Sequence, residues 1–169
     1  MIAGVDARAA LLADLDYEAA LTAPLLRRVP ETSMAWAPHP RAFSLGALTS
    51  HLAELPHWGV QILASPEYDF NAGTGVHRVR ATMSEVLDRF DRHLAELHGA
   101  LTARSVAELH APWTLRHGPR VLARMTRLDA VRRFALHHLV HHRGQLTVYL
   151  RVLDVPLPPM YGPTADEQP

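Results

Sequence analysis

The helical spacing of the leucines is the feature that most constrains how this chain can fold. In several long segments, apolar residues recur at intervals of three and four, which places them on one face of a helix. The pattern predicts long helices over about 5–29, 45–63, 83–103 and 129–153, with N-terminal caps at Asp6, Ser44, Thr82 and Asp129. Pro24 should bend the first helix, and Pro56 should kink or end the second near His51. Four such helices predict an all-α four-helix bundle.

The remaining segments connect or extend these helices. Between 105 and 127 the pattern weakens, and we expect a short helix followed by extended segments that cover one end of the molecule. We find no alternation strong enough to support a sheet. After Pro156 the proline-rich ending predicts an ordered apolar tail across the bundle, fraying after Tyr161. The length of 169 residues is that of one domain, which we expect to span 1–169.

Two residue types are absent, and their absence excludes whole classes of chemistry. All 17 basic residues are arginine, so Schiff-base and P-loop lysines are excluded. There is no cysteine, so a metal must be held by imidazole or carboxylate groups. The formal net charge is zero, which disfavours nucleic-acid and membrane-surface partners. No secretory signal or apolar run of about 20 residues is recognisable, so we expect a cytoplasmic protein.

The 12 histidines are therefore the feature to explain, and four of them are close together in the last predicted helix. With Leu139 at the centre of the apolar face, His138 lies about 100° and His142 about 60° away on the same side. The other pair, His137 and His141, lies about 160° away and should point outward. Residues four apart share a helix face, so His138 and His142 can reach a common ion.

The second predicted helix supplies a third imidazole. His51 lies about 100° from the centre of its apolar face, whereas His57 lies about 140° away on the other side. Three imidazoles on two helices, His51, His138 and His142, predict a metal site with an open fourth position. The alternative is that these histidines are solvated or form ordinary hydrogen bonds. The remaining histidines are interpreted as surface residues: His39, His77, His93, His98, His110 and His117.

The histidine segments also carry a family resemblance. The run from Ser44 to His51, followed much later by His138-x-x-x-His142 and Arg143-Gly-Gln145, resembles the DinB/YfiT-like superfamily of metal-dependent enzymes. The similarity spans essentially the whole chain. It implies a four-helix bundle that is commonly dimeric, with a divalent ion such as zinc or nickel on residues 51, 138 and 142.

The resemblance also implies a class of activity, since characterised relatives include transferases and isomerases that use bacillithiol, mycothiol or glutathione, and hydrolase-like members. We expect Lewis-acid catalysis on a small molecule, with water or a small thiol as the activated group. Helix phase makes Tyr149, Gln145, Trp58 and Arg143 candidate supporting or pocket residues, and no residue stands out as a general base. The rival hypothesis is a non-catalytic dimeric bundle with a structural metal.

Oligomeric state is predicted from apolar residues on the outward face of the last helix. Phe134, Val148 and Val152 lie about 140–180° from the centre of its apolar face. An exposed apolar patch of this kind marks association, so we expect a homodimer.

Overall fold

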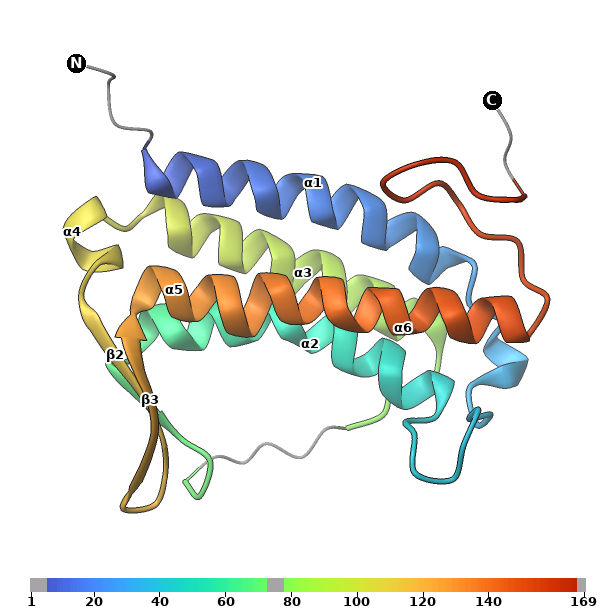
Figure 1. The fold of residues 1–169 in the computed structure, drawn as a ribbon, viewed down its shortest axis with the longest axis horizontal. Helices are drawn as coiled ribbons and strands as arrows, with labels where there is room; N and C mark the ends of the chain where they lie inside the picture. The colour runs from blue at the N-terminus through green and yellow to red at the C-terminus, as the bar shows by residue number, and fades with distance from the viewer. Residues whose placement is uncertain (1–5, 73–77, 167–169) are drawn as a thin grey trace.

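The computed structural model describes residues 6–72 and 78–166, and it is predominantly helical with a small three-stranded sheet at one end (Figure 1). The long helices α1, α2 and α3 run side by side with a fourth helical rod that contains α5 and α6 (Figure 1). The helices are α1 Ala7–Arg27, η1 Glu31–Ser33, α2 Leu45–Ala64, α3 Met83–Thr102, α4 Val106–Leu109, α5 Arg127–Val131, η2 Arg132–His137 and α6 His138–Val152. The strands are β1 Glu67–Asp69, β2 Pro112–His117 and β3 Arg120–Thr126.

Side-chain caps fix where the long helices begin. The side chains of Asp6, Ser44 and Thr82 each accept a hydrogen bond from a backbone N–H in the first turn of their helix, as predicted. The prediction for the last helix is wrong. Its cap is Thr126, whose hydroxyl accepts from the backbone N–H of Asp129. The helix therefore starts three residues earlier, directly from the end of β3.

Two irregular positions lie within the long helices. Pro56 does not end α2, which continues to Ala64, so of the two predicted outcomes, a kink or an end near His51, the end is wrong. In the fourth rod, η2 is a π-helical segment between α5 and α6. A π-helical segment shifts the phase of the helix around it and is frequent near functional sites. Here it ends directly before His138, and α6 is regular from that residue onward.

The sheet has the order β1-β2-β3, with β1 parallel to β2 and β2 antiparallel to β3. Gly118 makes the turn between β2 and β3 at a φ of 56°, a conformation that glycine adopts without a steric cost. The prediction of a short helix followed by extended segments at one end is confirmed by α4, β2 and β3 (Figure 1). The prediction that no sheet forms is wrong.

Two clusters of buried apolar side chains hold the helices together. One surrounds Leu48 and Leu52 of α2 and Leu146 and Leu150 of α6, and the other includes Trp113 of β2 and lies toward the sheet. Between α2 and α3 the backbones approach closely, because a Cβ added at Gly59 would come within 2.6 Å of the side chain of Leu97. A side chain at that position would push the two helices apart.

The segment after α6 is tied back to the helices. Leu157 is buried in the first cluster, and its backbone N–H donates to the carboxylate of Asp166. The same carboxylate pairs with Arg151 of α6. Among the described residues, no helix combines the length and the apolar character that a membrane span requires.

Candidate metal centre

The structure brings together the three imidazoles predicted from sequence. His51 comes from α2, and His138 and His142 come from successive turns of α6. The Nε2 atom of His138 lies 3.4 Å from Nε2 of His51 and 2.9 Å from Nε2 of His142. His51 and His142 are buried, with 7% and 8% of their surfaces exposed. In the described part of the chain, this set of ligand atoms lies close enough to hold one ion.

Gln145 orients the ring of His142. Its Oε1 atom lies 2.7 Å from Nδ1 of His142, and an amide oxygen can only accept, so Nδ1 carries the proton. In the neutral ring the lone pair is then on Nε2, the atom that faces His138. The amide nitrogen of Gln145 lies 3.1 Å from Nε2 of the exposed His141, which holds the amide in this orientation. A partner that fixes the tautomer of a metal-ligating histidine is a regular feature of metal sites.

The spacing of the nitrogen atoms suits a tetrahedral ion. Zinc–nitrogen bonds of about 2.0–2.1 Å at tetrahedral angles separate two ligand nitrogens by about 3.3–3.4 Å. The distance between the Nε2 atoms of His51 and His138 matches this value. The distance between the Nε2 atoms of His138 and His142 is shorter and would have to increase slightly to hold the ion. Neutral imidazole is a good ligand for zinc, nickel, copper and iron. The residues present therefore fit a divalent transition metal.

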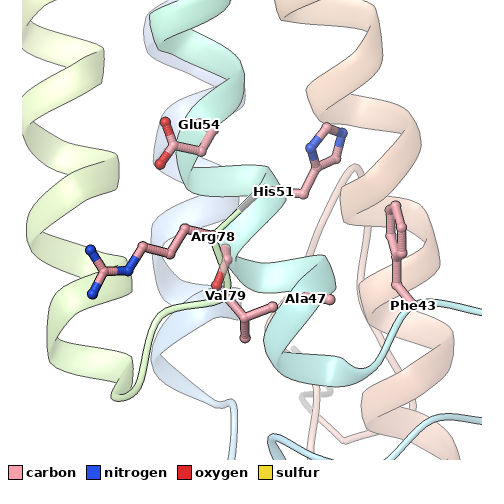
Figure 2. Close-up of a pocket in the computed structure, with 7 residues that line it drawn as sticks. Phe43, Ala47, His51, Glu54, Arg78 and Val79 are labelled. Carbon is pink, nitrogen blue, oxygen red and sulfur yellow. The ribbon is translucent and has the colours of Figure 1, made fainter. Parts of the chain in front are cut away.

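A small pocket with a cavity volume of about 20 Å³ lies beside His51. It is lined by Phe43, Ala47, Ser50, His51, Glu54, Arg78 and Val79. In Figure 2, His51 projects from α2 between Phe43 and the segment that contains Arg78 and Val79, and the guanidinium of Arg78 points away from the imidazole. The pocket reaches one imidazole of the set, His51.

Glu54, one turn after His51, fixes the wall of this pocket. Its carboxylate accepts hydrogen bonds from Arg80 and Arg89, and the backbone N–H of Arg80 donates to Ser50. Burial opposes ionisation of Glu54, but the two arginine hydrogen bonds outweigh burial and lower its pKa. The carboxylate is therefore charged, and its oxygens are already occupied by guanidinium groups.

Comparison with known proteins identifies the family. The sequence profile of the DinB superfamily matches residues 14–146, which is most of the chain. This chain belongs to the DinB superfamily.

Solved structures agree on the fold of this DinB protein. A DinB-like protein from Bacillus subtilis superposes with a TM-score of 0.67 at 15% identity, covering 90% of this chain and 98% of the other. A DinB-like protein from Bacillus cereus superposes with a TM-score of 0.64 at 20% identity, covering 85% and 90%. No curated protein sequence matches this chain. At these identities the likeness shows the fold alone.

In this DinB chain, two further predicted residues are near the imidazoles. Gln145 contacts His142 directly. Tyr149 is linked to the imidazoles through Phe43. Its hydroxyl donates to the backbone oxygen of Phe43, 3.1 Å away. The Phe43 ring in turn lies 5.9 Å from the His51 ring and 6.2 Å from the His142 ring, centroid to centroid. Burial raises the pKa of Tyr149, which keeps this hydroxyl protonated.

The other two predicted residues make their contacts elsewhere, which corrects the sequence interpretation. Trp58 packs against Tyr68 and Phe70 beside the sheet. Arg143 points toward α1, where its guanidinium donates to the backbone oxygen of Glu18 and pairs with the Glu18 carboxylate. Helix phase alone could not separate the two neighbours on α6, because both His142 and Arg143 are on its buried side.

Among the histidines interpreted as surface residues, His93 is the exception. It is 3% exposed, and burial lowers its pKa. His93 comes three residues after the buried Phe90 and four before the buried Leu97, so helical spacing already placed it on the inner face of α3. Four of the set are exposed as predicted: His39, His98, His110 and His117. His77 lies outside the described residues.

Proposed function

We propose that this DinB protein is a divalent-metal-dependent enzyme that acts on a small molecule, with His51, His138 and His142 as the metal ligands. The observation that carries the proposal is the convergence of three Nε2 atoms from two rigid helices beside a small pocket. In the part of the chain that the structure describes, no carboxylate or fourth imidazole joins this set. A site with three protein ligands and room for a further group is the arrangement of catalytic rather than structural zinc.

The ion would supply a Lewis acid that lowers the pKa of a water molecule or a small thiol at neutral pH. The chain itself supplies orientation and exclusion of water. Gln145 holds the ring of His142, and Phe43, positioned by Tyr149, covers one side of the imidazoles. Ser50 and Glu54 fix the segment at Arg80 that follows the pocket wall.

We further propose zinc or nickel as the metal and a thiol-dependent transfer or a hydrolysis as the reaction. Two observations support a thiol from solution as co-substrate: the chain has no cysteine, and the pocket is lined by one imidazole of the set, His51. The pocket combines the apolar Phe43 and Val79 with the polar Ser50 and the charged Arg78 and Glu54. This lining suits a small molecule with both apolar and polar parts.

The experiment that tests the function compares wild type with His142→Ala after loading with zinc or nickel. Both proteins are assayed against a panel of thiol-transfer and hydrolysis substrates, and their thermal unfolding is followed with and without chelator. The proposal predicts activity in the loaded wild type, none in His142→Ala, and a folded apo protein. A wild type that is silent across the panel but unfolds on chelation would instead support the structural-metal hypothesis.

We also propose that the helical rods form a four-helix bundle with an ordered proline-rich tail. We propose that the protein is a cytoplasmic homodimer. Val148 and Val152 support the dimer, because both are about 60% exposed on the outer face of α6. Phe134 does not contribute to this face, since its ring packs against Trp113. Light scattering at micromolar concentration should give twice the chain mass, and Val148→Ser with Val152→Ser should give the monomer.

A further inference from the structure

A second group of possible metal ligands is formed by residues of α2 and α3. His57 of α2 and His93 and Glu96 of α3 each present one ligand atom, and these atoms lie within 4.8 Å of one another. His57 follows His51 by six residues, so it is nearly two turns further along the helix. None of these three residues belongs to the pocket beside His51.

The backbone of α2 fixes the tautomer of His93. The Nδ1 atom of His93 lies 2.8 Å from the carbonyl oxygen of Ala53, and because a carbonyl oxygen only accepts, Nδ1 donates the proton. In the neutral ring the lone pair is then on Nε2. A ring N–H donated to a backbone carbonyl is a common way of orienting a metal-ligating histidine.

The other two ligands face each other across the contact between α2 and α3. The Nδ1 atom of His57 is buried, lies 3.5 Å from Oε2 of Glu96, and has no hydrogen-bond partner within the described residues. No arginine in the described ranges pairs with Glu96, although Arg80 and Arg89 both pair with Glu54 of α2. Glu96 is three residues after His93, so both project from one face of α3.

The ring spacing resembles that of the first site. The centroids of His57 and His93 are 4.8 Å apart, and those within the first set are 4.6–5.0 Å apart. Two imidazoles and a carboxylate are a donor set that zinc takes in proteins. The close approach of α2 and α3 at Gly59 fixes the position of His57 relative to His93 and Glu96.

We propose that His57, His93 and Glu96 form a second transition-metal site that links α2 to α3. It takes a zinc-like divalent ion, with water in the remaining positions, because His57 and Glu96 have 38% and 43% of their side-chain surface exposed. With two exposed ligands it binds more weakly than the site at His51, His138 and His142. This inference is independent of the function proposed for the first site.

The test is calorimetric titration of metal-free protein with Zn²⁺ alone, checked by the metal content after gel filtration. Wild type should take two equivalents. His57→Ala and Glu96→Gln should each weaken the second equivalent by at least about a hundredfold, since losing a ligand exceeds the 10–100-fold effect of losing a supporting residue. His142→Ala should lose the first equivalent and keep the second.

The matched control is His98→Ala, which removes an exposed imidazole from the same helix, α3, and should keep both equivalents. Circular dichroism verifies that each variant is folded. A second measurement is thermal unfolding of His142→Ala, which Zn²⁺ should stabilise, whereas the double variant with His57→Ala should not respond. A single equivalent in wild type that His57→Ala leaves unchanged, or an unchanged second equivalent in both His57→Ala and Glu96→Gln, would overturn the proposal.

Discussion

His142 and Arg143 are neighbours on α6, and both are buried, yet their surroundings differ. His142 faces α2, where its Nε2 atom meets another imidazole nitrogen at 2.9 Å. Arg143 faces α1, where its guanidinium meets the backbone oxygen of Glu18, the Glu18 carboxylate and the hydroxyls of Thr22 and Tyr161. The His142 imidazole therefore lies beside other imidazoles, whereas the Arg143 guanidinium is surrounded by hydrogen-bond acceptors.

The difference separates a binding site from a structural network. A buried charge needs its complementary partners, because removing one of them leaves the other charge uncompensated and destabilises the fold. The Nε2 atoms of the three imidazoles face one another, an arrangement that an N–H of one ring or a bound cation between them stabilises. We therefore propose metal binding at the imidazoles of α2 and α6, whereas Arg143 attaches α1 and the C-terminal segment to α6.

The largest expected effect is that of His142→Ala on metal affinity. Losing one of three neutral ligands should weaken zinc binding at this site by at least about a hundredfold, more than the loss of a supporting residue. The helical circular dichroism should remain near that of wild type, because the apolar clusters are left intact. The control is His137→Ala, which removes another exposed imidazole from the same helical rod and should bind zinc normally. Equal losses in the two variants would contradict the assignment.

Glu18→Ala tests the structural role of Arg143. It leaves the Arg143 guanidinium buried without its carboxylate, and the free energy of unfolding should fall by about 3 kcal/mol. Zinc affinity at the imidazoles should not change. Denaturant unfolding gives the first quantity and calorimetric titration the second. Asp16→Ala, an exposed carboxylate on the same helix, should stay within about 0.5 kcal/mol of wild type.

Gln145→Ala should have an intermediate effect. Without the amide oxygen that accepts from Nδ1, the His142 ring loses its fixed tautomer and orientation, and zinc affinity should fall by about 10–100-fold. Gln145→Glu keeps an acceptor oxygen and should restore most of the affinity. If alanine and glutamate variants bind zinc equally well, the role assigned to Gln145 is wrong.

The smallest effect concerns the segment that brings Tyr161 to Arg143. Hydrogen bonds from Arg151 and from the backbone of Leu157 lower the pKa of Asp166 from 3.8 to about 2. Because the pKa is lowered by folding, this attachment is present above about pH 4 and is lost as the pH falls toward 2. Protection of the Leu157 amide from hydrogen exchange, taken relative to the intrinsic rate at each pH, should fall over that interval. Asp166→Asn should give little protection at every pH, and protection that does not change with pH in wild type would rule out the attachment.

The predictions that succeeded from sequence rest on regular helices. The regular helix α6 contains His138, His142 and the leucines used to place them. A constant rotation of about 100° per residue therefore relates their positions correctly. Phe134 lies in the π-helical segment before α6, where that rotation does not hold, and its ring turns toward β2 instead. Helix caps at Asp6, Ser44 and Thr82 could be predicted because they depend on neighbouring residues alone.

The predictions that failed depend on contacts distant in sequence. The strand β3 is largely exposed and shows little alternation, so its pairing with β2 leaves almost no pattern in the sequence. Because β3 leads directly into α5, the cap falls at Thr126 rather than Asp129. Arg143 lies four residues after Leu139 and three before Leu146, a spacing that already indicated burial, but its partners on α1 and in the tail could not be read from α6.

The most direct test of the central claim is a crystal structure of the zinc-loaded protein with anomalous diffraction measured at the zinc edge. We predict a peak within about 2.0–2.2 Å of the Nε2 atoms of His51, His138 and His142, with a fourth position occupied by solvent. A loaded protein with no peak among these three imidazoles would contradict metal binding there. A peak whose fourth ligand is a protein side chain would contradict the catalytic assignment and favour a structural ion.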